Sequence, residues 1–60
     1  MLFDNVKKIL EERKISVVDF ESAIKVQRGT FYKWKDHSPS ISKVKEAAEF
    51  LNVTIDELMK

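Results

Sequence analysis

The 60-residue sequence contains no cysteine and a single histidine. Neither disulfide bonds nor the Cys/His zinc sites of small metal-stapled domains are therefore available to it. A chain without cysteine fits a reducing compartment. No apolar run approaches the ~20 residues that a membrane-spanning helix requires. The first residues also lack the charged-then-apolar order of a signal peptide. We expect a soluble, cytoplasmic protein that uses no metal or cofactor.

Glycine and proline, which most often interrupt regular structure, occur only once each, as Gly29 and Pro39. No low-complexity tract, internal repeat or linker divides the chain. Sixty residues are near the lower limit for a core that holds without metal or disulfides, so most of the 43% apolar residues should be buried together. We expect one domain over residues 1–60.

Apolar residues recur at three- and four-residue intervals along most of the chain, which predicts amphipathic helices and no strands. Helix N-termini are indicated at Ser16, at Ser40 and at the capping-box pair Thr54 and Glu57, and Asn52 is typical of a left-handed helix end. The expected fold is all-α, a compact bundle of five short helices. They span about residues 2–13, 17–24, 27–35 and 40–51, with a last short helix after Thr54.

Charge is distributed unevenly although the net charge is only +1. Residues 1–24 carry four bases against five acids, and residues 46–60 carry one base against four acids. Between them, residues 25–45 carry six bases against one acid. A basic middle between acidic flanks is typical of a chain with one face that meets a polyanion.

The stretch QRGTFYKW, residues 27–34, holds the only glycine, tryptophan and tyrosine. On a helix, Phe31 and Trp34 share one face and should be buried, while Arg28, Gly29 and Lys33 project outward. Glycine costs a helix interior roughly 1 kcal/mol relative to alanine. We therefore expect Gly29→Ala to stabilise the helix, and the glycine to serve as a gap that lets another molecule approach the backbone.

The segment SVVDFESAIKVQRGTFYKWK, residues 16–35, resembles the helix-turn-helix of phage-repressor and Cro-type transcriptional regulators (the lambda repressor-like, XRE family). The later segment PSISKVKEAAEFLNVTIDELM is similar to that family's fourth and fifth helices. The resemblance extends over nearly the whole chain. It implies a DNA-binding domain with a central helix-turn-helix and a recognition helix at about residues 27–35.

The resemblance also implies which residues meet double-stranded DNA. Positions matching Arg28, Gly29 and Lys33 face base edges in the major groove, where arginine and lysine can pair with guanine O6 and N7. Phosphate or groove-wall contacts are implied for Gln27, Tyr32, Lys35, Ser38, Ser40 and Lys43. Such a regulator acts as a homodimer on a palindromic operator, most simply as a repressor associated with the nucleoid.

This sequence departs from the family at three places. The family commonly has glycine at the corners where this chain has Lys14 and Lys25, so we expect these corners to be shaped differently here. Gln27 stands in place of the usual Ser or Thr cap of the recognition helix. Val17 stands where a glutamine often touches phosphate.

Other functions were weighed against DNA binding. Asp36, His37 and Ser38 are adjacent, whereas catalytic triads assemble from residues separated in sequence, so we expect no enzyme. The C-terminal residues Ile55, Leu58 and Met59 form the expected dimer surface. The alternative function is a helix-turn-helix fold used as a protein-interaction module, such as an antitoxin, antirepressor or docking partner. Its apolar surface would be Val17 with Val18, or Ile55 with Met59.

Overall fold

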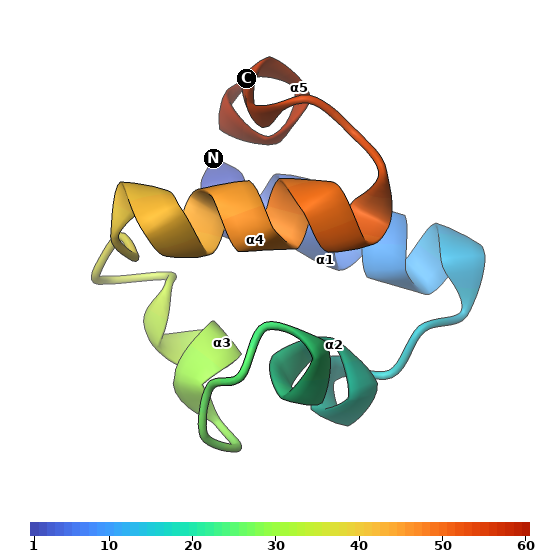
Figure 1. The fold of residues 1–60 in the computed structure, drawn as a ribbon, viewed down its shortest axis with the longest axis vertical. Helices are drawn as coiled ribbons and strands as arrows, with labels where there is room; N and C mark the ends of the chain where they lie inside the picture. The colour runs from blue at the N-terminus through green and yellow to red at the C-terminus, as the bar shows by residue number, and fades with distance from the viewer.

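The computed structural model describes all residues 1–60 and contains five helices and no strands (Figure 1). The prediction of an all-α fold is therefore confirmed. None of the helices combines the length and the apolar character needed to cross a membrane. The helices are α1 (Leu2–Arg13), α2 (Val17–Ala23), α3 (Thr30–Lys33), α4 (Ile41–Leu51) and α5 (Ile55–Met59).

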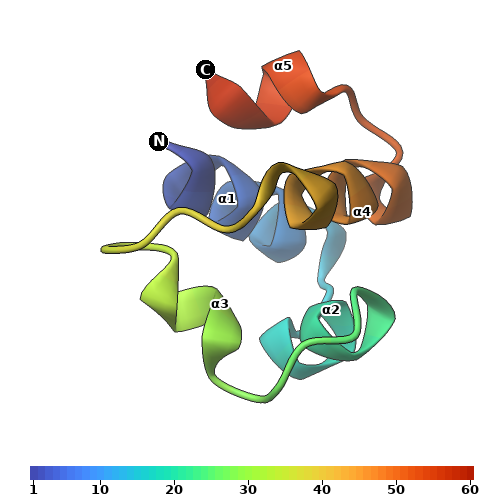
Figure 2. The same ribbon diagram turned by 60° about the vertical axis from the view of Figure 1, so that its left-hand side comes forward.

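The helices are arranged in three levels. In both ribbon views, α1 and α4 form the middle level, α5 lies above them, and α2 and α3 lie below (Figures 1 and 2). Helix α5 packs on α1 and α4, and α2 packs on α3. The Asn5 side-chain amide donates to the carbonyls of Leu58 at 2.7 Å and Lys60 at 2.9 Å, which fastens the C-terminal end to α1.

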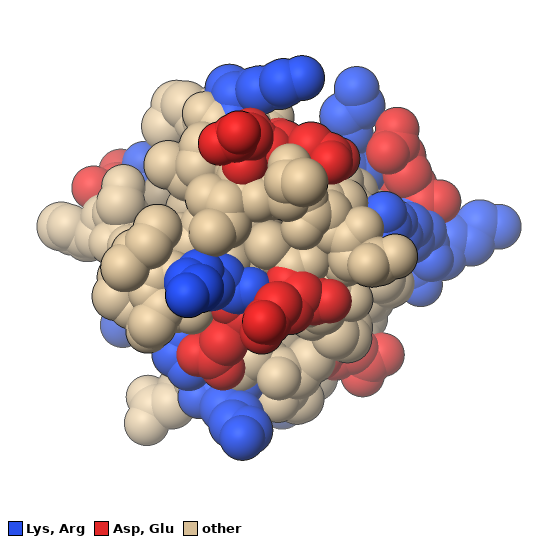
Figure 3. Space-filling model, turned by 45° about the horizontal axis from the view of Figure 1, so that its top comes forward, with Lys and Arg blue, Asp and Glu red and all other residues tan.

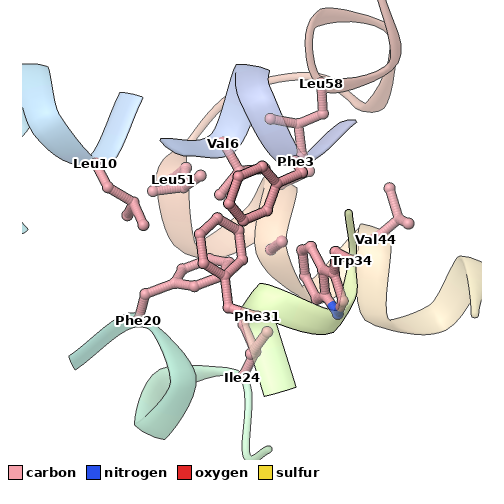
Figure 4. Close-up of a cluster of buried hydrophobic side chains, with 12 residues drawn as sticks. Phe3, Val6, Leu10, Phe20, Ile24, Phe31, Trp34, Val44, Leu51 and Leu58 are labelled. Carbon is pink, nitrogen blue, oxygen red and sulfur yellow. The ribbon is translucent and has the colours of Figure 1, made fainter. Parts of the chain in front are cut away.

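The space between the levels is filled by one apolar cluster to which every helix contributes (Figure 4). Aromatic rings from α1, α2 and α3 meet at its centre, where Phe31 stacks on Phe3 with ring centroids 4.6 Å apart and meets Phe20 edge-on at 5.5 Å. The members are Phe3, Val6, Leu10, Phe20, Ile24, Phe31, Trp34, Val44, Ala47, Ala48, Leu51 and Leu58.

Three helices begin where the sequence predicts. The hydroxyl of Ser16 accepts the Asp19 backbone N–H at 3.0 Å and that of Ser40 accepts the Lys43 N–H at 3.4 Å. Thr54 and Glu57 form the full capping box of α5. These side chains satisfy N–H groups that a helix start leaves without partners.

The corners at Lys14 and Lys25 differ from our expectation of an altered shape, because both lysines adopt the left-handed conformation that glycine takes most readily. Their φ values are 57° and 61°, and Asn52 has 57°. At each corner the next residue donates back to a carbonyl five positions earlier, as in Ile15 to Leu10 at 2.9 Å. This pattern is a Schellman motif. The residue after each corner is aliphatic and packs on the core: Ile15, Val26 and Val53. This burial and the hydrogen bonds offset the cost of about 1 to 2 kcal/mol of a left-handed lysine.

Candidate nucleic-acid interface

The segment that precedes α3 is a tight turn and not the first turn of a helix. The Thr30 N–H donates to the Gln27 carbonyl at 3.1 Å, and Gly29 has φ 90° and ψ −11°. A glycine with positive φ at the third position is the mark of a type II turn. The prediction of a helix from Gln27 is therefore wrong: α3 begins at Thr30, and Gly29 is its N-cap.

The role of Gly29 changes accordingly. The expectation that alanine at this position stabilises a helix does not hold, because the backbone here requires a conformation that L-residues rarely adopt. A Cβ added at Gly29 would have no heavy-atom neighbour within 4 Å. The position is thus open on its outer side, and the turn itself explains why the residue is glycine.

Helix α3 has only four residues and is held by its aromatic side chains. Phe31 is fully buried and Trp34 is 6% exposed, as the sequence predicts. The Trp34 ring lies edge-on to Phe31 at 5.4 Å and to Phe20 at 5.9 Å. A helix this short is not stable by its own hydrogen bonds, so this packing fixes where the segment lies.

Arg28 and Lys33 project from opposite ends of the anchored segment, Arg28 from the turn and Lys33 from the last residue of α3. Both are exposed. The only ion pair in the structure joins Lys43 and Glu46, so no carboxylate neutralises Arg28 or Lys33. Two exposed cations without carboxylate partners, carried by a segment anchored to the core, suit an anionic partner.

The remaining residues with expected DNA contacts divide into two groups. Gln27, Tyr32, Lys35 and Ser38 are exposed around the turn and α3, with Tyr32 50% exposed. The Lys35 ammonium lies 5.2 Å from the centroid of the Phe3 ring, which brings α1 beside this surface. Ser40 is exposed, but its hydroxyl is already engaged as the cap of α4.

Lys43 is partly buried and has partners within the domain. Its ammonium donates to the Ile24 carbonyl at 2.8 Å and pairs with Glu46 at 3.0 Å. Ile24 is the C-cap of α2, where carbonyl groups lack partners within the helix and a cation is favourable. Lys43 therefore has two partners within the domain, and its expected phosphate contact stays a prediction.

Sequence reasoning missed Glu21. This residue of α2 is 2% exposed, and its carboxylate Oε2 accepts the Phe31 backbone N–H at 2.9 Å. It thereby supplies the acceptor that Gly29, the N-cap of α3, cannot provide because glycine has no side chain. In the sequence, an acidic residue beside Phe20 on a helix that should be half buried is the only sign of this role.

The C-terminal surface is smaller than expected. Leu58 is fully buried in the core, so it cannot take part in a dimer surface. Ile55 is partly buried, and Met59 is 55% exposed. Figure 3 shows the face over α4 and α5, where Lys and Arg side chains lie beside Asp and Glu side chains around an uncharged area. Of Val17 and Val18, Val18 is the exposed one, at 42%.

The surface thus offers Arg28 and Lys33 as exposed cations without carboxylate partners around a short anchored helix. It offers no group of three His, Asp or Glu side chains that could hold a metal ion. Comparison with known proteins agrees with this geometry. A family model described as the Cro/C1-type HTH DNA-binding domain matches residues 5–60. The matched range includes the turn, α3 and both cations. No curated protein and no solved structure gives a significant match.

Proposed function

This chain belongs to the Cro/C1-type helix-turn-helix DNA-binding domain family, and we propose that it reads a specific sequence in double-stranded DNA with the turn and α3 in the major groove. It binds DNA as part of a transcription regulator. In the proposed role, Arg28 and Lys33 contact base edges. Contacts to the groove wall or to phosphates come from Gln27, Tyr32, Lys35, Ser38 and Ser40. The activity is binding without catalysis.

The single observation that supports this proposal is the presentation of Arg28 and Lys33. Both cations are exposed and free of carboxylate partners, on a segment that Phe31 and Trp34 fasten to the core. A specific contact requires a side chain held at a defined place, because each bidentate contact to guanine contributes about 1 to 3 kcal/mol only when its geometry is met.

Selection from a pool of random duplexes tests the proposal. The unsubstituted chain should enrich one sequence, and Arg28→Ala and Lys33→Ala should each relax the preference at a different position of that sequence. Lys8→Ala, which removes a lysine from the exposed side of α1, is the matched control and should recover the original sequence. Recovery of the same consensus by both interface variants would defeat the base-reading role.

The regulator would act as a homodimer that blocks polymerase at an operator. Two copies of α3 would then lie about one DNA turn, ~34 Å, apart on a palindromic site. Ile55 and Met59 are the accessible apolar residues of α5 that support a contact between copies. Sedimentation as a single copy on a two-half-site duplex would exclude the dimer.

A protein-interaction module is the second candidate function. It is favoured by exposed apolar side chains on other helices than α3, including Val18 of α2 at 42% and Met59 of α5 at 55%. Salt separates the two functions. DNA binding through several phosphates should weaken steeply between 50 and 200 mM salt, by about 10³-fold or more for six contacts. An apolar protein interface should respond little to the same change.

A further inference from the structure

Two charged side chains brace the turn that leads into α3, one from each side. Glu21 reaches from α2 to the backbone N–H of Phe31 at 2.9 Å. Lys43 reaches from α4 to the carbonyl of Ile24 at 2.8 Å, and Glu46 accepts a second contact from its ammonium at 3.0 Å. The chain between Ile24 and Phe31 is thereby held at both of its ends.

Both side chains bind backbone groups that have no partner within their own helix. Phe31 is the second residue of α3, so its N–H has no carbonyl partner within that helix. Ile24 is the C-cap of α2, so its carbonyl has no N–H partner within that helix. A carboxylate as buried as that of Glu21 is costly unless it is hydrogen-bonded. Its bond to Phe31 therefore ties the start of α3 to α2 in one arrangement.

We propose that Glu21 and Lys43 are positioning residues for DNA recognition, which fix the turn and α3 so that Arg28 and Lys33 reach the bases. This inference rests on the proposed function. We expect neither residue to contact DNA directly, because the Glu21 side chain is buried and the Lys43 ammonium already binds the Ile24 carbonyl and Glu46. Both residues fix the geometry of the free protein. Less free energy is then needed to order the interface when DNA binds.

Substitution of Glu21 tests the proposal, because a positioning role and simple electrostatics predict opposite changes in the affinity for DNA. Loss of any negative charge near the interface should strengthen binding to all DNA through long-range attraction alone. Loss of a positioning carboxylate should instead weaken binding to the selected sequence and leave random DNA little affected. Asp19, an exposed acid two residues earlier on α2, provides the matched control for the charge.

The experiment compares Glu21→Leu, Glu21→Gln and Asp19→Asn. Each affinity is measured for the selected duplex and for a random duplex, and backbone amide exchange is followed by NMR. We expect Glu21→Leu to lower the ratio of specific to random affinity on the order of tenfold, because it removes a hydrogen bond to a charged group. Glu21→Gln keeps an acceptor oxygen but forms a weaker bond, so it should restore part of the ratio.

Amide exchange measures the hydrogen bond between Glu21 and the Phe31 N–H in the absence of DNA. In both Glu21 variants the Phe31 amide should exchange faster than in the unsubstituted chain, while the core amide of Leu51 should not. If Glu21→Leu fails to fold, the glutamine variant decides by the same two measurements. An unchanged Phe31 exchange rate, or an equal gain in affinity for both duplexes as in Asp19→Asn, would overturn the role of Glu21.

Lys43 is tested by the salt dependence of binding. Lys43→Met should weaken binding to the selected duplex without changing the slope of affinity against salt. Lys35→Met, at a proposed phosphate contact, should reduce the slope by about one. An equal reduction by Lys43→Met would show that Lys43 contacts phosphate and would overturn its positioning role. If the unsubstituted chain enriches no sequence, the proposed function fails, and the Phe31 exchange rate still shows whether Glu21 holds α3.

Discussion

Gly29 and Lys25 lie four residues apart around the turn, and both have positive φ, at 90° and 61°. At the scale of single residues, the two positions lead to opposite predictions for stability. At Gly29 the residue type suits the left-handed conformation. At Lys25 it does not, and neighbouring interactions hold the lysine in that conformation. Substitutions at the two positions should therefore change stability in opposite directions.

Gly29→Ala should lower the free energy of unfolding by about 1 to 2 kcal/mol, because alanine must adopt a left-handed conformation. The added methyl group meets no atom within 4 Å, so the backbone alone causes the loss. Urea unfolding followed by circular dichroism measures it. An alanine variant as stable as the unsubstituted chain would contradict the turn described for residues 27–30.

Lys25→Gly should raise the free energy of unfolding by roughly 1 kcal/mol, since glycine adopts the same conformation without the steric cost. Lys14→Gly is the matched variant at the first corner, where φ is 57°, and it should give a gain of similar size. Both are measured by the same urea titration. Loss of stability in both variants would show that the lysine side chains contribute more than their conformation costs.

At the scale of elements, local signals predict helix starts well. The side chains of Ser16, Ser40 and Thr54 each accept an N–H three residues ahead, so a short window of sequence contains both partners. The start of α3 was predicted too early because residues 27–30 form a turn, and the Phe31 N–H finds its acceptor in Glu21, ten residues earlier in the chain and on another helix. No short window contains that pair. The contact between the Lys43 ammonium and the Ile24 carbonyl joins residues nineteen positions apart, so no short window predicts it either.

Ser16→Ala tests the cap of α2. We expect a loss of about 1 kcal/mol, because the Asp19 N–H loses its acceptor at 3.0 Å. Ser22→Ala is the control within the same helix: Ser22 is exposed, and alanine is the better helix former, so this change should be neutral or slightly stabilising. Thermal unfolding of the two variants side by side gives the comparison. Equal effects would contradict the capping role of Ser16.

At the scale of the whole molecule, a 60-residue domain has little stability to spare, on the order of 0.05 to 0.15 kcal/mol per residue. Every helix contributes to a single core, and α5 takes part in it through Leu58, which is fully buried. The sequence predicted five helices around one core but assigned Leu58 to an outer surface. Helical spacing alone does not show which side of a five-residue helix faces its neighbours.

Leu58→Ala should therefore lower the free energy of unfolding by about 2 to 5 kcal/mol, enough to unfold much of the protein at room temperature. Met59→Ala, at the adjacent residue with 55% exposure, should change stability little in the single copy. Chemical unfolding of both variants at low protein concentration measures the difference. Comparable losses in both would contradict the orientation of α5.

The position of Trp34 has a practical consequence for optical work. It is the only tryptophan of the chain, it directly follows α3, and it lies edge-on to two phenylalanine rings in the core. Its indole fluorescence therefore reports on one event, the docking of α3 onto the rest of the molecule. A red shift of the emission that precedes the loss of helical signal during denaturation would mark release of that segment while the other helices remain folded. No dye or engineered probe is needed to observe it.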